Sequence, residues 1–519
     1  MWVYPEIRLL GDTIGFHARH APTRPALISE STPVSFGELD GLTNKIAHAL
    51  HGQGVNRGAR VIFFGKNSLD FYLALFGCAK AGVCFIPLNW RLAAAELVTV
   101  SRDAEAHFAI VEREFQSTWL DVCSACDAQI ETLYVDGCST MSLWCANSPA
   151  TPLKAHIRED DPVILLYTSG TTGLPKGVLH THASFNHSRL SEHFERAYEW
   201  REGDVFLCPL PNFHLLHIAL ALQCLYNGVA VSIQRHFDPA LFLAGIHRER
   251  PSLLVLTPTM IQMMLDHPDA ATTDFGSVRL TMYAGSPISL GLIKRAIATI
   301  PCQFMQFYGQ TETSGPVSLL RPDEHDLGNE EKLKSCGRPL PLISLRIVDG
   351  LGQDVADGTP GELLVRAPAS SAGYWRQPEQ TEDRFRNGWY HTGDIAYRDS
   401  EGLYYIYDRA KDMIVTGGEN VYSAEVENAL SLHPAVAAVA VIGVPDERWG
   451  EAVKGIIVCK KGQAPDAADL IRFCRARLAG YKVPKSIDFI EALPMTATGK
   501  VSKTSLRAPY WDSMQRSVA

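Results

Sequence analysis

The sequence predicts an α/β fold in which parallel-rich sheets are covered by helices, with a small α+β domain at the C-terminal end. Three observations support this prediction. Short apolar runs alternate with helical segments through the first two thirds of the chain, which is typical of βα units. Short strands separated by turn residues then follow from 338 to about 405, which predicts a small β-barrel subdomain. After residue 408 the alternation resumes over about 110 residues, a normal size for a separate domain.

These observations divide the 519 residues into two expected domains. The N-terminal domain covers residues 1–408, and the mobile C-terminal domain covers residues 409–519. Within the first, we expect α/β subdomains at about 1–160 and 161–337 and the β-barrel subdomain at 338–408. Three to four structural units are a reasonable prior for a chain of this length.

The elements of the first third each have a local signal. Ser68 is a residue type that caps helix N-termini, and Gly82 is typical of a helix end, so a helix is expected up to Ala81. We also expect a helix at about 37–50 and strands at residues 26–29, 60–64, 83–87 and 108–111.

The remaining elements are predicted from the same signals, which are cap residues for helices and short apolar runs for strands. In the C-terminal domain, Ser423 is expected to cap a helix that runs to His433, and Asp466 to cap a helix that ends near Gly480. Strands are expected at residues 204–208, 229–233, 253–256, 279–283, 344–348, 361–366, 395–397, 436–444 and 453–458.

The composition excludes some classes of protein. The chain has 48 Lys and Arg against 57 Asp and Glu, a net charge of −9, which disfavours a general nucleic-acid binder. Polar residues interrupt the longest apolar stretches, at 75–88 and 217–233, so no membrane span is expected. The N-terminus lacks the pattern of a secretory signal. We expect a cytoplasmic protein, with peripheral membrane contact and a homodimer left open.

The stretch Tyr167–Gly177, YTSGTTGLPKG, has the composition of a phosphate-binding loop. Gly170 and Gly173 allow the backbone to approach a ligand, exposed N–H and hydroxyl groups suit phosphate oxygens, and Lys176 adds a positive charge. The common P-loop pattern fails, because Pro175 stands before this lysine. Apolar residues on both sides predict a loop in a β-hairpin. The alternative is an ordinary flexible hairpin turn.

Two further segments end at predicted strands. PLPNFHLLH, residues 209–217, places His214 where ligand crevices of α/β sheets open, although a core histidine is the alternative. YAGSPIS, residues 283–289, contains Gly285, which permits a flat ring to approach the backbone. A strand–helix turn capped by a serine fits the same residues.

Two more segments contain oxygen ligands. In FYGQTETSG, residues 307–315, Tyr308 can stack on a base, Thr311 can bind phosphate, and Glu312 is a hard ligand suited to Mg²⁺. A solvated loop acid is the alternative for Glu312. In GWYHTGDIA, residues 388–396, the two oxygens of Asp394 suit a ribose diol.

Together with VSFGELD, YDRAKDMIVTGGENVYSAEVE and PMTATGKVSK, these motifs stand in a specific order from about residue 10 to about residue 510. In order and spacing the chain resembles the adenylate-forming superfamily, and within it the AMP-forming acyl-CoA synthetases. The resemblance implies ATP, Mg²⁺ and coenzyme A as the small molecules bound, besides a carboxylic acid.

The resemblance also assigns roles to residues. Catalytic roles fall to Lys500, Glu312, Lys176 and His214. The ATP and AMP site would comprise Thr168, Ser169, Gly170, Thr171, Thr172, Gly173, Lys176, Gly285, Ser286, Tyr308, Gly309, Thr311, Asp394, Arg409 and Lys500, with Glu312 on the metal. The acyl pocket would comprise His214, Tyr283, Ala284, Gly285 and Gln310, and the CoA site Gly417, Gly418 and Glu419. Lys411 would be the hinge of the C-terminal domain.

These roles predict an ATP-dependent ligase that forms acyl-AMP and pyrophosphate and then acyl-CoA and AMP. Because no charged residue stands out in the pocket stretches, a medium- or long-chain fatty acid is the expected substrate. An aromatic acid of the cinnamate or benzoate type is an alternative, as is a ligase that loads a carrier protein. A non-catalytic nucleotide sensor is disfavoured by the joint presence of Lys176, Glu312 and Lys500.

Overall fold

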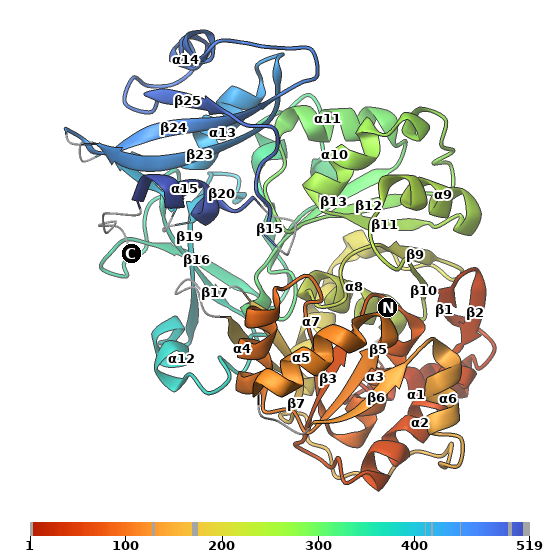
Figure 1. Ribbon diagram of the computed structural model, residues 1–519. Helices are drawn as coiled ribbons and strands as arrows, with labels where there is room; N and C mark the ends of the chain where they lie inside the picture. The colour runs from red at the N-terminus through yellow and green to blue at the C-terminus, as the bar shows by residue number, and fades with distance from the viewer. Residues whose placement is uncertain are drawn as a thin grey trace.

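A computed structural model describes residues 4–126, 130–168, 175–409, 412–416, 419–446, 448–496 and 501–511 (Figure 1). The strands of this described part form four sheets. Every helix among the described residues is too short or too polar to span a lipid bilayer. The mixture of parallel-rich sheets and helices confirms the predicted fold class.

The first sheet has six strands among the described residues. Its neighbours run parallel except at one edge, where β7 and β8 form an antiparallel hairpin. In spatial order the strands are β6 (Glu131–Val135), β5 (Phe108–Glu112), β3 (Arg60–Phe64), β4 (Cys84–Pro87), β7 (Pro162–Thr168) and β8 (Lys176–Thr181).

The second sheet has nine strands among the described residues. It is parallel from β13 to β1 and antiparallel at both edges. In spatial order the strands are β15 (Arg338–Pro339), β14 (Ser318–Leu320), β13 (Gln303–Tyr308), β12 (Leu280–Tyr283), β11 (Leu253–Leu256), β9 (Val205–Cys208), β10 (Ala230–Ile233), β1 (Pro25–Ser29) and β2 (Thr32–Ser35).

The strand partners correct the expected boundary at residues 160 and 161. The hairpin β1–β2 belongs to the second sheet because β1 pairs with β10, and β7–β8 belong to the first sheet because β7 pairs with β4. The chain therefore crosses between the two sheets twice. Local apolar patterns predict where strands occur but carry no information on which distant strand each one joins.

Helices fill the space between the sheets and cover their outer faces. They are α1 (Asp12–His20), α2 (Phe36–Gly52), α3 (Leu69–Ala81), α4 (Ala94–Ala104), α5 (Gln116–Cys126), α6 (Cys138–Trp144), α7 (His182–Phe194), α8 (Leu215–Tyr226), α9 (Pro239–Glu249), α10 (Pro258–Asp266), α11 (Leu290–Thr299) and α12 (Pro378–Arg384). The predicted caps are present: the Ser68 side chain accepts a hydrogen bond from the backbone of Phe71, and Gly82 is left-handed.

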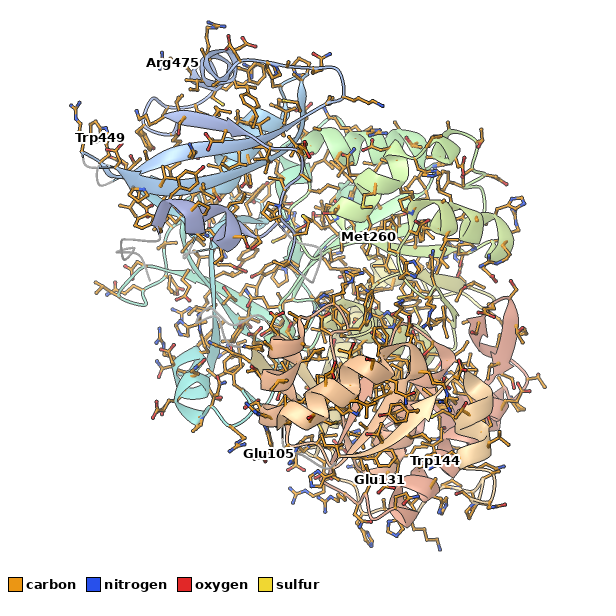
Figure 2. The ribbon with its side chains drawn as sticks, viewed as in Figure 1. Glu105, Glu131, Trp144, Met260, Trp449 and Arg475 are labelled. Atoms are coloured by element: carbon orange, nitrogen blue, oxygen red, sulfur yellow. The ribbon has the colours of Figure 1, made fainter. Side chains whose placement is uncertain are left out.

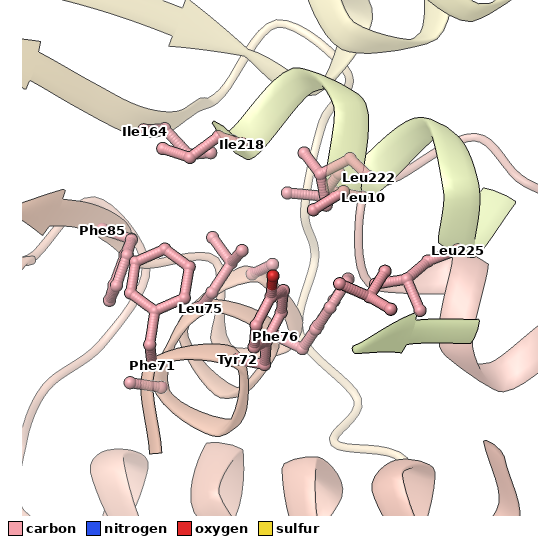
Figure 3. Close-up of a cluster of buried hydrophobic side chains, with 14 of the residues drawn as sticks. Leu10, Phe71, Tyr72, Leu75, Phe76, Phe85, Ile164, Ile218, Leu222 and Leu225 are labelled. Atoms are coloured by element: carbon pink, nitrogen blue, oxygen red, sulfur yellow. The ribbon is translucent and has the colours of Figure 1, made fainter. Parts of the chain in front are cut away.

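The largest core lies where α3 and α8 meet. Figure 3 shows Phe71, Tyr72, Leu75 and Phe76 of α3 beside Ile218, Leu222 and Leu225 of α8, with Phe85 and Ile164 from the first sheet. Separate cores lie under α4 and α5 and under α9, α10 and α11. Met260, labelled in Figure 2, packs against both the central core and the core under α9–α11. Burial of these apolar surfaces is the dominant favourable contribution to folding.

A third sheet follows the second. It is antiparallel, and among the described residues no pairing closes it into the expected barrel. Its strands are β16 (Ser344–Val348), β17 (Gly361–Arg366), β18 (Phe385–Arg386), β19 (Trp389–Arg398) and β20 (Tyr404–Arg409). A density of short strands predicts how many strands form but does not predict closure.

The C-terminal unit is the predicted α+β fold (blue in Figure 1). Its elements are β21 (Ile414–Thr416), β22 (Glu419–Val421), α13 (Ser423–Ser431), β23 (Val436–Asp446), β24 (Gly450–Cys459), α14 (Ala467–Arg475), β25 (Ser486–Phe489) and α15 (Lys503–Trp511). Asp466 caps α14 as predicted, whereas Tyr422 and not Ser423 precedes the first residue of α13. Trp449 and Arg475 point outward from this unit (Figure 2).

One aromatic contact joins this unit to the third sheet. Tyr407 on β20 stacks on Tyr422, with ring centroids 4.6 Å apart and an interplanar angle of 11°. Tyr397 extends the row, because its ring lies 4.9 Å from that of Tyr407. The stack therefore connects β20, which precedes the predicted hinge Lys411, with Tyr422, which follows it.

Candidate active site

The residues on both sides of the predicted phosphate loop form the two strands of a β-hairpin. Thr168, the last residue of β7, pairs with Lys176, the first of β8, and its hydroxyl donates to the Lys176 carbonyl over 3.4 Å. This pairing agrees with the predicted hairpin and with the failure of the P-loop pattern, which requires a helix after the glycines. Residues 169–174 lie outside the described residues.

Lys176 and Glu312 meet through a tyrosine. The Tyr374 hydroxyl donates to Glu312 Oε1 over 2.9 Å, and the Lys176 ammonium lies 5.6 Å from the centre of the Tyr374 ring. Burial is the main cause that lowers the pKa of Lys176, Arg384 adds to the shift, and Glu312 opposes it. Tyr374 thus contacts both the cation of Lys176 and the carboxylate of Glu312. The two residues are 136 positions apart in the sequence (312 − 176).

The segment around Tyr374 holds both partners in place. The backbone of Trp375 donates to the Gly177 carbonyl over 2.7 Å, which fixes the segment along β8. The backbone of Ser371 donates to the Glu312 carbonyl over 2.8 Å. These backbone bonds set the position of the Glu312 turn relative to the start of β8.

A second hydrogen-bonded group surrounds Asp394 on β19. Its Oδ2 accepts from the Tyr308 hydroxyl over 2.6 Å and from the Gln310 amide over 2.7 Å. The Tyr390 hydroxyl donates to Gln310 Oε1 over 2.6 Å. Arg409 on β20 stands directly opposite Asp394 in the strand register. The two predicted ribose-binding positions are therefore neighbours, and Tyr308 is tied to the same group.

The remaining nucleotide-site residues follow neighbouring parallel strands. β12 ends at Tyr283 and β13 at Tyr308, so Gly285 and Ser286 lie next to Gly309 and Thr311 at the carboxyl edge of the second sheet. Ligands of open α/β sheets bind at this edge. Gly285 has a φ of +94°, a conformation that disfavours a side chain.

The structure separates the predicted acyl-pocket residues. Ala284 packs with the central core, whereas the Tyr283 side chain points into the core under α9–α11 and its hydroxyl lies 3.0 Å from the His325 ring nitrogen Nε2. Successive side chains of a strand point to opposite faces. The Tyr283 and Ala284 side chains therefore lie on different faces, and the place of Tyr283 in an acyl pocket stays a prediction.

His214 precedes α8 and lies against another aromatic ring. The centroids of the Phe213 and His214 rings are 4.8 Å apart, and Phe213 in turn lies 6.1 Å from Trp90. His214 therefore belongs to an aromatic group at the end of β9, on the edge where Gly285 and Gly309 also lie.

The other predicted positions divide into two groups. Glu419 is exposed at the start of β22. The positions outside the described residues are Ser169, Gly170, Thr171, Thr172, Gly173, Lys411, Gly417, Gly418 and Lys500.

Sequence reasoning missed Tyr374 and Tyr390. Both contact predicted site residues through their hydroxyls, at Glu312 and Gln310. Tyr390 lies inside the motif at residues 388–396, so its place in the motif was enough to predict it as a site residue. Tyr374 stands in a segment without helical or strand periodicity, and only its backbone pairing with β8 reveals its place.

Glu312 also fits the implied magnesium ion. One of its oxygens accepts from Tyr374, which leaves the other oxygen for a ligand bond. Among the described residues no group of three or more His, Cys, Asp or Glu is placed to hold a metal. Mg²⁺ commonly binds one or two carboxylates and completes its shell with water and substrate phosphates, which matches a single protein carboxylate.

Gly285→Ala is expected to lower the free energy of unfolding by about 1–3 kcal/mol, because a residue with a side chain is strained at this φ. Space is not the cause: the nearest atom to an added Cβ is the Thr257 methyl at 3.7 Å. The matched control is Gly291→Ala on α11, where an added Cβ meets no atom within 4 Å. The control is expected to raise stability by about 0.5–1 kcal/mol. Urea denaturation measures both, and equal effects would contradict the strain argument.

Comparison with known proteins agrees with this geometry. Residues 16–375 match the family of AMP-binding enzymes, and residues 425–500 match the AMP-binding enzyme C-terminal domain. The chain is 38% identical over 518 residues to a fatty acid–[acyl-carrier-protein] ligase, ScoC of Streptomyces coeruleorubidus, covering 99% of each chain. It is 35% identical to a feruloyl-CoA synthase of an Amycolatopsis species, covering 95% of this chain and 97% of the relative.

A solved structure is similar over nearly the whole chain. It is the O-succinylbenzoate coenzyme A synthetase MenE of Bacillus subtilis in complex with ATP and a magnesium ion, with a TM-score of 0.83. The identity is 28%, and 95% of this chain and 98% of that chain are covered. With matches to both family models and relatives that cover the full length, the chain belongs to the AMP-binding enzymes of the adenylate-forming superfamily, the AMP-forming acid–thiol ligases.

Proposed function

We propose that this protein activates a carboxylic acid with ATP and transfers the acyl group to coenzyme A. The observation that supports the proposal is the meeting of Lys176 and Glu312 through Tyr374, beside the Asp394 group. A cation at the end of the hairpin and a carboxylate next to it suit a nucleotide triphosphate with its metal ion. A nucleotide sensor would use the same groups to bind ATP, and release of pyrophosphate is the measurement that distinguishes the ligase from it.

The reaction has two steps. A carboxylate oxygen of the acid attacks the α-phosphorus of ATP, and the bond from that phosphorus to the pyrophosphate oxygen breaks. Lys500 is proposed to bridge the two negative groups as charge builds at phosphorus, and Lys176 to hold the departing phosphates. The thiol sulfur of coenzyme A then attacks the acyl carbon, the bond to AMP breaks, and the thiol proton passes to solvent.

The other residues bind and orient. Asp394 and Arg409 are proposed to hold the ribose, while Gly285, Ser286, Tyr308 and Gly309 surround the adenine. Glu312 is proposed to hold Mg²⁺, which neutralises phosphate charge when it is bound. His214 is proposed to stand between the acyl site and the thiol, because it follows β9 at the sheet edge.

The acid is proposed to be a medium- or long-chain fatty acid. Leu215 and Leu216 follow His214 in the sequence and are apolar. Both pack on the central core, which also contains Ala284, and Met260 packs on the same core. An aromatic acid of the cinnamate or benzoate type is the alternative. The names of the two relatives, which refer to a fatty acid and to a feruloyl group, leave both classes open.

A carrier-protein thiol is the second candidate acceptor. The relative at 38% identity is named a fatty acid–[acyl-carrier-protein] ligase. Coenzyme A and a carrier protein present the same phosphopantetheine thiol, so the residues around His214 serve either acceptor. The two differ in what contacts the outer surface.

One assay separates these possibilities. Pyrophosphate release is measured with fatty acids of increasing length and with cinnamates and benzoates, and thioester is then measured with coenzyme A and with a holo-carrier protein. We expect pyrophosphate and acyl-CoA with fatty acids. Thioester on the carrier protein alone would assign the second acceptor, and no pyrophosphate release with any acid would overturn the proposal.

We further propose that the unit after residue 408 rotates about Lys411 between the two steps, so that Lys500 gives way to the thiol. Proline fixes φ near −65° and removes a backbone donor, so Lys411→Pro should hold one orientation. The variant is expected to form acyl-AMP and pyrophosphate in a burst but to transfer the acyl group at least about 10-fold more slowly. Unchanged rates of both steps in a variant with normal melting would place the hinge elsewhere.

A further inference from the structure

Asp103, near the end of helix α4, contacts two parts of the candidate active site that are far apart in the sequence. The Tyr167 hydroxyl donates to Asp103 Oδ2 over 2.6 Å, a distance typical of a hydroxyl that donates to a carboxylate. The indole N–H of Trp375 donates to the Asp103 backbone carbonyl over 2.9 Å. Tyr167 immediately precedes Thr168, and Trp375 immediately follows Tyr374. Asp103 therefore bonds to the direct neighbours of two residues of the candidate site.

The side chains of Tyr167 and Trp375 both lie over Gly177. Tyr167 and Gly177 are partners in the register of β7 and β8, the two strands that flank the predicted phosphate loop. A Cβ added to Gly177 would lie 3.2 Å from the Trp375 Cβ and 3.3 Å from the Tyr167 Cζ, so the glycine leaves room for both side chains. Both side chains also pack on the core under α4 and α5. The strands on both sides of the loop thus share one packed region with Trp375.

Arg60, the first residue of the inner strand β3, holds the end of α4 in place. Its Nε donates to the Ala104 carbonyl over 2.7 Å, and its Nη2 donates to the Glu105 carbonyl over 2.9 Å (Glu105 is labelled in Figure 2). A cation stabilises the carbonyls that a helix leaves without partners at its carboxyl end. The guanidinium carbon of Arg60 also lies 4.8 Å from the centre of the Trp375 ring. The end of α4 is therefore fixed to the first sheet, and Asp103 has a firm support.

The Tyr167 hydroxyl is held as a donor to Asp103. Burial raises the pKa of this phenol, and the hydrogen bond to Asp103 adds to the shift, so the phenol keeps its proton at neutral pH. A phenol has one proton to donate, and the carboxylate of Asp103 accepts it. Loss of the carboxylate would leave the hydroxyl without this acceptor in a partly buried place, which is unfavourable unless the ring moves. The position of the Tyr167 ring, and with it the end of β7, therefore depends on Asp103.

We propose that Asp103 is a positioning residue for the ATP-dependent step. Its carboxylate orients Tyr167 at the end of β7, and its carbonyl orients Trp375, whose backbone is bonded to β8. Asp103 thereby fixes the two strands that flank the predicted phosphate loop relative to the Tyr374 hydroxyl, which donates to Glu312. The inference rests on the proposed function, in which these strands carry groups that bind the phosphates of ATP.

This role is limited to the first step of the reaction. The three phosphates of ATP and their metal ion must be bound during adenylation, whereas the attack of the thiol on acyl-AMP involves neither the pyrophosphate nor its metal ion. A small displacement of phosphate-binding groups lowers the rate of adenylation, because the reacting atoms must be aligned. A general loss of stability would instead reduce the amount of active enzyme for both steps alike. A comparison of the two steps therefore separates positioning from stability.

The test measures both steps in Asp103→Ala. The kcat/KM for ATP is measured as ATP–pyrophosphate exchange with octanoate and with cinnamate, and thioester formation is measured from chemically prepared acyl-AMP and coenzyme A. We expect kcat/KM for ATP to fall about 10-fold or more and the rate of thioester formation to stay within about twofold of wild type. Asp103→Asn keeps an acceptor oxygen for the Tyr167 hydroxyl and is expected to restore kcat/KM for ATP to within about threefold of wild type.

Tyr167→Phe removes the same hydrogen bond from its other side and keeps the ring. It is expected to show the same difference between the two steps, which provides a second reading where Asp103→Ala folds poorly. Because both substitutions break one bond, the double variant is expected to lose no more in kcat/KM for ATP than the more affected single variant.

Asp161→Ala is the matched control. Asp161 stands just before the other end of β7 and accepts from Nε and Nη2 of Arg57 over 2.7 Å each. The control is expected to lower the melting temperature and to leave kcat/KM for ATP within about twofold of wild type. Equal losses in both steps for Asp103→Ala, an unchanged kcat/KM for ATP, or a matching loss in the control would overturn the role of Asp103 and leave the ligase proposal intact. No ATP–pyrophosphate exchange by the wild type with any acid would overturn the proposed function itself.

Discussion

Replacing Lys500 by alanine is expected to lower acyl-AMP formation by about 100-fold or more, the usual effect of removing one group that stabilises charge in a transition state. The first step brings a carboxylate to the α-phosphate of ATP, so two negative groups approach and charge builds at phosphorus. An ammonium positioned between them stabilises that arrangement. The second step involves a neutral carbonyl and a thiol, and Lys500 has no role in it under our proposal.

The two steps are measured separately. Acyl-AMP formation is followed as ATP–pyrophosphate exchange, and thioester formation is followed from chemically prepared acyl-AMP and coenzyme A. Lys485→Ala, at an exposed position of the same unit, is the control for loss of one positive charge. An equal loss in both steps for Lys500→Ala would contradict a role restricted to adenylation.

Glu312→Gln is expected to have the second largest effect, a fall of about 100-fold in adenylation with a higher Mg²⁺ requirement. The amide is weaker than a carboxylate as a ligand for a hard cation. Its oxygen can still accept from the Tyr374 hydroxyl, which lies 2.9 Å from Glu312 Oε1, so the turn is expected to keep its position. The readout is the Mg²⁺ concentration that gives half-maximal pyrophosphate release.

Tyr374→Phe is the matched control for this change. It removes the hydrogen bond to Glu312 and keeps both the carboxylate and the ring beside Lys176. We expect a loss of about 10-fold or less, with nearly normal Mg²⁺ dependence. Unchanged Mg²⁺ dependence in Glu312→Gln would show that the carboxylate does not bind the metal ion.

Local signals in the sequence were sufficient for much of this fold. Ser68 and Gly82 mark the ends of α3, and the strands β3, β9, β11 and β12 are short apolar runs between turn residues. The partners of strands were not predictable in this way: β1 joins β10 across about 200 residues of chain, and no local pattern records that distance.

The site residues divide in the same way, into features that the local sequence predicts and features that depend on distant contacts. The motifs around Glu312 and Asp394 carry hydroxyl, amide and carboxylate groups whose chemistry can be read from residue type. The direction of the Tyr283 side chain could not be read, because all residues of β12 are buried and no polar alternation marks the two faces. Tyr374 reaches Glu312 only because its segment pairs with β8, a contact that depends on the assembled sheets.

The stack of Tyr407 on Tyr422 has a consequence for the resting enzyme. An aromatic pair of this kind contributes about 0.5–1.5 kcal/mol beyond its buried area. If rotation about Lys411 separates the two rings, the stack shifts the equilibrium between the two orientations by roughly two- to thirteenfold in favour of the stacked one. A bias of this size leaves the other orientation populated at the level of several per cent or more if the remaining contacts are balanced. Substrates then need only a small difference in affinity between the two orientations to reverse the preference at each step.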